Sequence, residues 1–516
     1  MKKIILIILI CILFLFACDN SSKDSDVLTN EETLAPTIKE ETFVPSNNEE
    51  EINLKIYDTI LKEAKDYIAI ANKNYSINSL EKKEHKGYDF VGFSYLEHGE
   101  IIKKSSISFD SDTTLFANYK INEDFFMIDN ISDVYIECST SITSKEAYNN
   151  AKIKIDDKKY PIDSDVLIRL RGNSTFHVAK KSYKLKFNEK VDLFGMGKDK
   201  EWALLANYFD PTYMRNFYAY RFAEALGLEY SIQTKYVNLY LNKEYVGIYL
   251  LTETVKTSKN RVNIEKQNLN ESEVPFLLEL DMKIVQDNPN YYEILDDEAF
   301  ILDNMDYNGK RYPFATKYPK SFKDLTTDQY KYIKDYMFNV YESVRSGNFI
   351  EYIDLDSFMN YFIIQELFMN VDLDYSSVFM YKPFGEKLHF GPIWDFDLSS
   401  GNVSYLNNYH PYSTMLQSNG GNYLFEEAIK NKDFNKMVTD RIKEIEDIVN
   451  AMLESIYDNY SILQGYYFLD NSIWNVLNDH NWARPNHLVG ISYNEQVVYF
   501  KNYISDHYKW LKNINL

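Results

Sequence analysis

Two runs of β-branched and aromatic residues, separated by a short turn, constrain the fold of the C-terminal half most strongly. Residues 378–381 and 388–393 predict strands, and the intervening Pro383-Phe-Gly385 is typical of a turn, so the segment predicts a β-hairpin. Asp372 precedes the first strand and Asp395 follows the second. Because the outer ends of an antiparallel hairpin lie together, we expect these carboxylates within one or two strand spacings, roughly 5 Å each.

Neighbouring carboxylates at the end of a hairpin suit phosphoryl transfer. One acid can orient an acceptor hydroxyl as a base, and the other can hold Mg²⁺ on the phosphates. Asp395-Phe-Asp397 is also an Asp-x-Asp motif, which is typical of metal-dependent glycosyltransferases. Since no Rossmann-like βαβ run precedes the motif, the glycosyltransferase is the weaker alternative.

The first residues predict an export signal. Met1-Lys-Lys is basic, and residues 4–16 form an apolar run that is too short to cross a bilayer, which needs about 20 residues. Leu15-Phe-Ala-Cys18 resembles a bacterial lipobox, so we expect residues 1–17 to be a lipoprotein signal peptide and Cys18 to carry lipid. An ordinary cleaved signal or an uncleaved anchor would explain the same apolar run.

Residues 18–52 are mostly acidic and polar, with few apolar side chains. Such a segment cannot bury enough surface to order itself, so it predicts a disordered tether. Together with the lipid, the tether predicts an exported protein that is anchored to a membrane, in the cell envelope or at the cell surface.

Charge and cysteine content restrict the partners and the source of stability. The net charge is −21, from 56 basic and 77 acidic residues, which argues against nucleic acid and favours basic protein partners. Cys138 is the one cysteine beyond the signal and the lipobox, so the mature chain has no intrachain disulfide to form. The histidines lack the spacing of zinc ligands.

Two small units are expected between the tether and the main domain. Ile56, Ile60 and Ala64 recur at helical spacing, which predicts an amphipathic helical segment over 53–84. Residues 85–122 alternate apolar and polar positions between glycines, and they resemble the small β-grasp repeat of bacterial surface proteins called the internalin B-repeat, or Listeria-Bacteroides repeat. This resemblance implies a compact β module that serves as a spacer or an adhesive unit.

The main domain, residues 128–516, opens with strands that end in a polar turn. Arg171-Gly-Asn-Ser-Thr forms the turn, and Lys184 and Lys186 then alternate with apolar residues in the next predicted strand. Backbone N–H groups of such a turn, beside lysines, can cradle a phosphate. A solvated edge strand beside a Gly-Asn turn would explain the same residues without a ligand.

Further elements follow in a mixed order. A helix is predicted over 217–227, with Asp210 or Thr212 as its cap, and a hairpin is predicted from 236–241 and 245–253. Another helix over 355–369 is expected to bury the base of the acidic hairpin, and helices are expected to fill most of the remaining chain.

Taken together, several motifs in this order resemble the CotH spore-coat protein kinase family over about 130–516. The motifs are Arg-Gly-Asn-Ser-Thr, Lys-Lys-x-Tyr-Lys-Leu-Lys-Phe, Trp-x-Leu-Leu-Ala-Asn with Met-Arg-Asn, Tyr-Leu-Asn-x-Glu-Tyr-x-Gly-x-Tyr-Leu-Leu-Thr-Glu, and Pro-Ile-Trp-Asp-Phe-Asp. The resemblance implies an α+β, atypical protein-kinase-like fold with a β-rich nucleotide lobe and a helical C-terminal lobe. It also implies ATP with Mg²⁺ or Mn²⁺ as cofactors, and Ser or Thr of exported proteins as acceptors.

The resemblance also implies roles for individual residues. Asp372 matches the catalytic acid, Asp395 matches the metal-binding acid, and Asp397 is a candidate ligand for a second ion. The candidate nucleotide-binding residues are Arg171 and Asn173 in the phosphate loop, Lys184 or Lys186 at the phosphates, and Glu253 near the adenine. Glu224 is a candidate to pair with the phosphate-binding lysine.

The sequence departs from the protein-kinase pattern at two points. Protein kinases carry a metal-binding Asn five positions after the catalytic Asp, where this chain has Ser377, and there is no complete Gly-x-Gly-x-x-Gly loop. A surface binding protein built on a kinase-like scaffold, without catalysis, therefore remains the main alternative to a kinase.

Overall fold

The structure is a computed structural model that describes residues 50–286, 293–302, 312–406, 410–416 and 422–516. The expected signal peptide (1–17), Cys18 and nearly all of the expected tether (18–52) lie outside these residues. Among the helices that the structure describes, none has both the length and the apolar character needed to cross a membrane.

The first described residues form a mixed β-sheet. Its strands, in the order β2-β1-β6-β4, are β1 (Glu51–Asp58), β2 (Glu63–Ile70), β4 (Tyr88–Ser94) and β6 (Thr113–Ile121). β1 and β6 pair in parallel at the centre, and β4 pairs antiparallel with β6. A separate pair, β3 (Asn74–Ser76) and β5 (Ser106–Ser108), lies in the connections.

The helix predicted over 53–84 is therefore wrong. Ile52, Leu54 and Ile56 are buried and alternate with more exposed residues, which is the period-two pattern of a strand. The same segment also contains a few apolar residues at helical spacing, but alternation with a β-branched composition prevails. The β module therefore begins at Glu51, inside the end of the expected tether, and not near residue 85.

The next strands close into a barrel in the order β10-β11-β13-β12-β7-β8-β9. Their bounds are β7 Ser132–Cys138, β8 Asn149–Ile155, β9 Ile162–Arg171, β10 Ser182–Asp192, β11 Lys198–Leu205, β12 Thr234–Leu241 and β13 Glu244–Thr252. Ile168 and Leu185 pair across β9 and β10 in the barrel core, so Arg169 and Lys184, which also pair, project from the outer face. The hairpin predicted from 236–253 is confirmed as β12 and β13.

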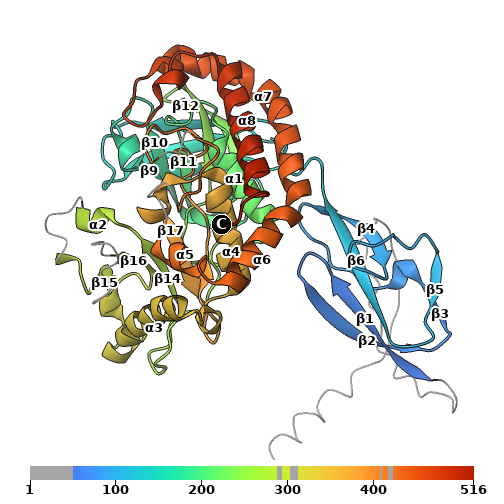
Figure 1. The fold of residues 1–516 in the computed structure, drawn as a ribbon. Helices are drawn as coiled ribbons and strands as arrows, with labels where there is room; N and C mark the ends of the chain where they lie inside the picture. The colour runs from blue at the N-terminus through green and yellow to red at the C-terminus, as the bar shows by residue number, and fades with distance from the viewer. Residues whose placement is uncertain (1–49, 287–292, 303–311, 407–409, 417–421) are drawn as a thin grey trace, which may run out of the picture. The chain divides into compact units, whose positions relative to one another are not determined.

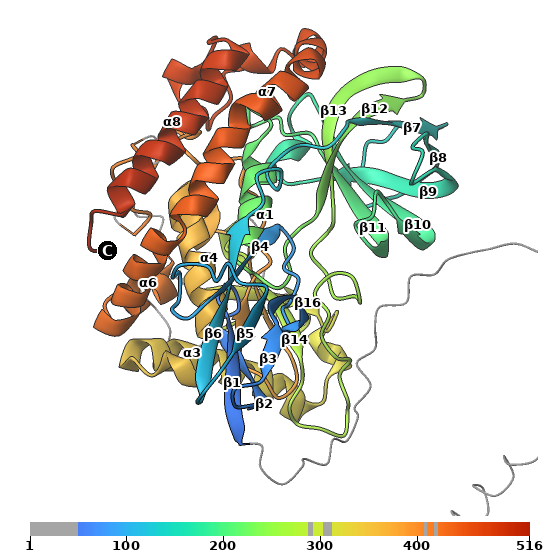
Figure 2. The same cartoon turned by 90° about the vertical axis from the view of Figure 1, so that its right-hand side faces the viewer.

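A second sheet and a set of helices complete the main domain. The sheet has the order β15-β16-β14-β17-β18, with β14 Phe276–Leu280, β15 Ala299–Ile301, β16 Pro313–Tyr318, β17 Val378–Lys382 and β18 His389–Phe390. The helices are α1 Arg215–Ala225, α2 Lys283–Gln286, α3 Thr327–Ser346, α4 Leu355–Phe368, α5 Tyr423–Ala428, α6 Lys432–Glu444, α7 Glu446–Trp474 and α8 Tyr493–Leu511. α7 and α8 run side by side in Figures 1 and 2. The class is mixed α+β, as expected.

The helix predicted over 217–227 is present as α1, but it begins at Arg215, and its N-cap is Met214, without a side-chain capping bond, and not Asp210 or Thr212. α1 begins after Asp210 and Thr212, whose side chains accept hydrogen bonds from the N–H groups of Arg215 (2.8 Å) and Met214 (3.2 Å). The acidic hairpin is confirmed by the antiparallel pairing of β17 with β18, although β18 is shorter than the predicted strand.

A buried ion pair joins the barrel to the C-terminal helices. Lys180 and Asp470, from α7, are both fully buried with their charged atoms 2.6 Å apart. Lys180 also donates to the Ile248 carbonyl, and Asp470 accepts from the Ile248 N–H and the Tyr213 hydroxyl. Gly247 allows this approach, because a Cβ there would lie 2.3 Å from the Asp470 carboxylate. This contact explains the Gly of the Tyr-x-Gly motif in the hairpin.

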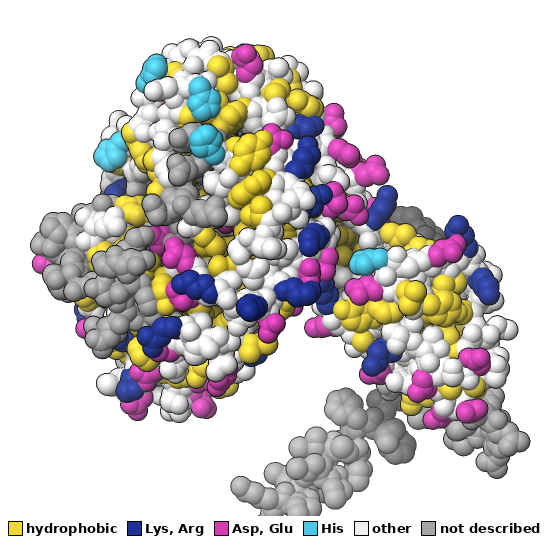
Figure 3. Space-filling view, viewed as in Figure 1, with side chains coloured by type: hydrophobic (Ala, Val, Ile, Leu, Met, Phe, Trp, Pro, Cys, Tyr) yellow, Lys and Arg dark blue, Asp and Glu magenta, His cyan; other side chains and the backbone are white. Residues whose placement is uncertain are grey.

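Charged side chains of both signs are mixed on the surface. On the face drawn in Figure 3, Lys and Arg side chains lie next to acidic ones. On α6, for example, Asp440 forms ion pairs with both Lys436 and Lys443. The basic residues on this face are therefore offset by neighbouring carboxylates, which agrees with the acidic composition.

Candidate functional site

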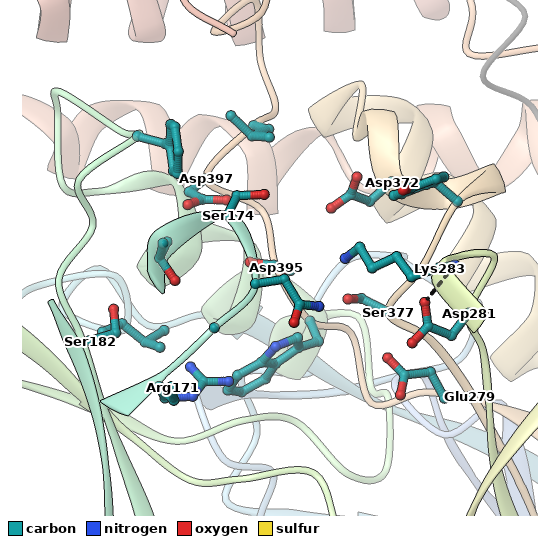
Figure 4. Close-up of a pocket in the computed structure, with 18 of the residues that line it drawn as sticks. Arg171, Ser174, Ser182, Glu279, Asp281, Lys283, Asp372, Ser377, Asp395 and Asp397 are labelled. Atoms are coloured by element: carbon teal, nitrogen blue, oxygen red, sulfur yellow. Dashed lines mark hydrogen bonds between the residues drawn. The ribbon is translucent and has the colours of Figure 1, made fainter. Parts of the chain in front are cut away.

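A cavity of about 1340 Å³ lies where the barrel meets the second sheet. Its lining includes the end of β9 with the following turn, the start of β10, the ends of β14 and β17, and the segment after β18. Figure 4 shows the labelled side chains of these regions pointing into one space. The cavity therefore brings together residues that are far apart in the sequence.

One wall of the cavity is basic. Arg169, Arg171 and Lys184 line it from β9 and β10. The Arg171 guanidinium lies 5.1 Å from the centre of the Trp394 ring, and the Lys184 ammonium lies 2.8 Å from Glu201 on β11. The Nε of Arg169 is buried and has no hydrogen-bond partner among the described residues, so it is free for an anionic ligand.

The turn after β9 completes the basic wall. Gly172 has a φ of +95°, and a Cβ there would lie 1.8 Å from the Thr175 hydroxyl, so this position requires glycine. Asn173 is exposed, lines the cavity and makes no capping bond to the short 3₁₀ helix that follows. Its amide is therefore available to a ligand.

The structure separates the two candidate lysines. Lys184 lines the cavity, whereas Lys186 is exposed on the same face of β10 and lies beyond the cavity lining. Two residues along a strand correspond to about 6.6 Å, which is enough to carry Lys186 past the cavity.

Two acidic candidates also differ from expectation. The Glu253 carboxylate is buried against Arg261 (2.5 Å) and accepts from the Gln233 N–H, so it supports the chain that leads to Thr254 and does not line the cavity. Glu224 bonds to Arg221 and Gln233 and is not the partner of the cavity lysine, a place that Glu201 takes.

Asp372 enters the cavity from the end of α4. The Asp354 side chain caps α4, and the helix ends at Met369, which has a left-handed backbone. Asn370 then caps a single 3₁₀ turn, Val371–Asp374, by accepting from the Asp372 N–H at 3.3 Å. The buried helix thus fixes the backbone that presents the Asp372 carboxylate.

Asp395 lies on the opposite side with a strained backbone. Its φ is +66°, a conformation that costs a non-glycine residue about 1–2 kcal/mol and that clusters at functional sites. The Tyr220 hydroxyl faces the Asp395 N–H at 3.4 Å, and the Asn216 side chain accepts from the Phe396 N–H at 2.7 Å. Both supporting residues come from α1.

The Met-Arg-Asn motif also fixes the segment that carries Asp397. Arg215 is fully buried, pairs with Asp210 at 2.5 Å and donates to the backbone carbonyls of Ser399 and Ser400. Within the described part of the chain, the turn at 399–402 donates no hydrogen bond to the Asp397 carboxylate, and no helix begins there. The alternative to a metal-binding role for Asp397, a helix cap or an acceptor for the turn that follows it, is therefore not supported by the geometry.

The carboxylates influence one another electrostatically. Burial raises the pKa of Asp372 to about 7, the Asp395 charge adds to the rise, and Lys283 opposes it. Burial and the charges of Asp395 and Asp372 raise the pKa of Asp397 well above its usual range. A cation among these groups would offset the repulsion between the carboxylates and stabilise their charged forms, so the arrangement favours cation binding.

The donor set fits a divalent ion that is shared with phosphates. Among the described residues, no cluster of three His, Cys, Asp or Glu side chains is close enough to hold a metal alone. Mg²⁺ is usually bound by one or two carboxylates together with substrate phosphates and water. Asp395 and Asp397, on the same side of the cavity as Arg171 of the basic wall, match that pattern.

The structure also reveals cavity residues that the motifs did not suggest. Lys283 lies beside Asp372, and the buried Thr254 hydroxyl has no hydrogen-bond partner in the described chain. Arg169 could have been found, because it is two residues before Arg171 and shares its strand face. Lys283 has no such sequence signal, since it reaches the cavity through the pairing of distant strands.

Comparison with known proteins adds a family assignment. A model of the family described as CotH kinase protein matches residues 168–511, which include both walls of the cavity. No curated protein matches the chain.

Proposed function

The chain belongs to the CotH kinase protein family, and on this premise we propose that it is an atypical protein kinase. It moves the γ-phosphoryl group of ATP to Ser or Thr of surface or envelope proteins. The observation that carries the proposal is the placement of Asp372 across one cavity from Asp395, Asp397 and a basic wall. In this proposal the barrel acts as the nucleotide lobe and the helical part as the second lobe of a kinase-like fold.

The basic wall would hold the phosphates of ATP. Arg171, Lys184 and the unpartnered Nε of Arg169 supply positive charge, and the turn at Gly172 and Asn173 supplies backbone and side-chain donors. Leu205 and Val255 offer apolar contact for the adenine, and the unpartnered Thr254 hydroxyl offers it a polar one.

Asp395 and Asp397 would hold Mg²⁺ or Mn²⁺, which neutralises phosphate charge when bound. Asp372 would orient the acceptor hydroxyl and take its proton. Burial raises the pKa of Asp372 to about 7, so at neutral pH a large share of this carboxyl is ionised and able to accept a proton. Rigid support from α4 keeps the carboxylate in position.

A direct test uses the chain without its first 18 residues. We expect transfer of radiolabel from the γ-phosphate of ATP to Ser or Thr, in the protein itself or in a basic acceptor protein, when Mg²⁺ or Mn²⁺ is present. A thermal-shift screen with ATP and with a sugar nucleotide accompanies it. Absence of transfer would contradict the proposal; stabilisation by ATP alone would then favour a binding protein, and stabilisation by the sugar nucleotide a glycosyltransferase.

Asp397→Asn tests the metal site. We expect it to raise the Mg²⁺ concentration for half-maximal ATP binding by at least about tenfold, because even the loss of an outer-shell partner costs about 10–100-fold in metal affinity. Ser377→Ala should change it much less, since a neutral hydroxyl is a weaker ligand. The melting temperature without metal should not fall, because burial already disfavours the charged carboxylate. A large loss of apo stability with unchanged metal dependence would show that Asp397 is structural.

We also propose that Cys18 carries lipid and that the following residues tether the enzyme to a membrane, with the β module over 51–121 as a spacer or adhesive unit. The support is the lipobox-like Leu15-Phe-Ala-Cys18 and the acidic segment after it. Cys18→Ser should move the protein into the soluble fraction, because acyl chains supply the apolar anchor. A variant that still sediments with membranes after a salt wash would contradict the lipoprotein assignment.

A further inference from the structure

Lys283 is a cation of the cavity that lies outside every family motif quoted above. It is the first residue of α2, and two residues separate it from the end of β14. β14 pairs antiparallel with β17, and Leu280 lies opposite Val378. The end of β14 therefore meets the start of β17, and Lys283 comes to lie beside the residues that follow Asp372.

Several bonds hold Lys283 in this place. Its ammonium donates to the Ser376 hydroxyl at 2.9 Å, and its backbone N–H donates to Asp281 at 3.1 Å. The neighbouring Met282 N–H donates to the Tyr375 carbonyl at 2.7 Å. In Figure 4 the Lys283 side chain points into the cavity between Asp372 and Ser377, towards Asp395.

The charged groups around Lys283 include the two acids, Asp372 and Asp395, to which we assign roles in the reaction. Burial lowers its pKa, but the carboxylates of Asp372, Asp395 and Asp281 outweigh burial and raise it, so the side chain is a cation. Within the described residues, no carboxylate lies within ion-pair distance of its ammonium. A lysine that only neutralised one acid would form a direct ion pair with it. Lys283 instead lies between Asp372, the proposed base, and Asp395, a proposed metal ligand.

We propose that Lys283 is a catalytic residue whose ammonium contacts the phosphoryl group in transfer, between Asp372 and the metal-binding acids. The inference rests on the proposed kinase function. In the reaction, the acceptor oxygen bonds to the γ-phosphorus and the bond from that phosphorus to the β,γ-bridging oxygen breaks. ADP leaves with the electron pair, and Asp372 takes the hydroxyl proton. Negative charge on the phosphoryl oxygens then meets Lys283 in a site of low dielectric constant.

The same position predicts an effect on metal binding without any reaction. Lys283 and a divalent ion both balance the charges of Asp395 and Asp372. Removing the lysine charge leaves those carboxylates more attractive to a metal ion. The lysine therefore weakens metal binding in the absence of nucleotide while it accelerates transfer.

The test compares Lys283→Met and Lys283→Arg with wild type, and with Lys320→Met as a matched change at an exposed lysine. For Lys283→Met we expect transfer to fall by about 10²–10³-fold, as for loss of one charge-stabilising donor, with ATP affinity little changed. Titration with Mn²⁺ alone should show tighter binding than wild type. Lys283→Arg should bind Mn²⁺ like wild type, and Lys320→Met should match wild type in both measurements.

Two results would overturn the role of Lys283 without affecting the proposed kinase function. One is transfer by Lys283→Met at the wild-type rate, and the other is Mn²⁺ binding by that variant that is unchanged or weaker while its melting temperature is normal. If Lys283→Met does not fold, Lys283→Arg decides, because a retained charge at a shifted position should reduce transfer while Mn²⁺ binding stays at the wild-type level. Absence of transfer by wild type would instead contradict the kinase function, and with it the catalytic role of Lys283. The wild-type measurement thus distinguishes the two failures.

Discussion

Asp372→Ala is expected to remove phosphate transfer while ATP binding stays largely intact. The base acts on the acceptor hydroxyl, whereas nucleotide affinity comes from the basic wall and the metal-binding acids on the other side of the cavity. Loss of a general base lowers a rate by about 10²–10⁴-fold. Radiolabel transfer and ATP binding by calorimetry, both with Mg²⁺, measure the two effects separately.

The matched control for this variant is Asp356→Ala. Asp356 is an exposed acid in the first turn of α4, the helix that presents Asp372, and it does not line the cavity. It should transfer phosphate at the wild-type rate. Equal activity in wild type and Asp372→Ala would refute the role of Asp372, and a joint loss of ATP binding and transfer would place Asp372 among the nucleotide ligands.

Lys180→Met is expected to cause the largest loss of stability, about 3–5 kcal/mol in the free energy of unfolding. It leaves the fully buried Asp470 side chain without its cation, although the Ile248 N–H and the Tyr213 hydroxyl remain as donors. Urea unfolding followed by fluorescence measures the loss. Lys190→Met, the same change at an exposed position of β10, should alter stability by no more than about 0.5 kcal/mol.

A second substitution shows which part of the buried pair carries the cost. Because the unpaired charge is the expensive element, Lys180→Met combined with Asp470→Asn should be more stable than Lys180→Met alone. Asparagine removes the charge, and its one carbonyl oxygen can still accept from the Ile248 N–H while its NH₂ group donates to the Tyr213 hydroxyl oxygen. A double variant that is less stable than the single one would mean that hydrogen bonding, and not the uncompensated charge, dominates.

The elements that sequence predicts well are those with one strong local pattern. The hairpin at 236–253 has a short turn between two runs of β-branched and aromatic residues, and the helix at 355–369 begins at a side-chain cap, Asp354, that is close in sequence. The helix predicted over 53–84 is wrong because the apolar residues there fit both the helical period of 3.6 residues and the strand period of two. Long-range pairing of β1 with β6 decided between them, and no local window contains that information.

The site shows the same division between local and distant information. Arg171, Asp372 and Asp395 line one cavity, and each lies at the end of a predicted element. Choosing Lys184 over Lys186 needs the register of β10 in the closed barrel, and recognising Lys283 needs the pairing of β14 with β17. The partner of Lys184 is Glu201 and not the expected Glu224, because strands β10 and β11 are adjacent. The helical pattern around Glu224 gave no information about which strand lies next to β10.

The link between Lys180 and Asp470 has a consequence for how the protein matures. The two residues are separated by 290 positions, so the barrel acquires the partner of its buried cation only when the last helices are present. A chain that crosses a membrane from its N-terminus, as we propose for this one, would emerge with the barrel strands first and the stabilising carboxylate near the end. Folding would then be completed after translocation, and the cavity would assemble only outside the cytoplasm, where we propose that the acceptor proteins lie.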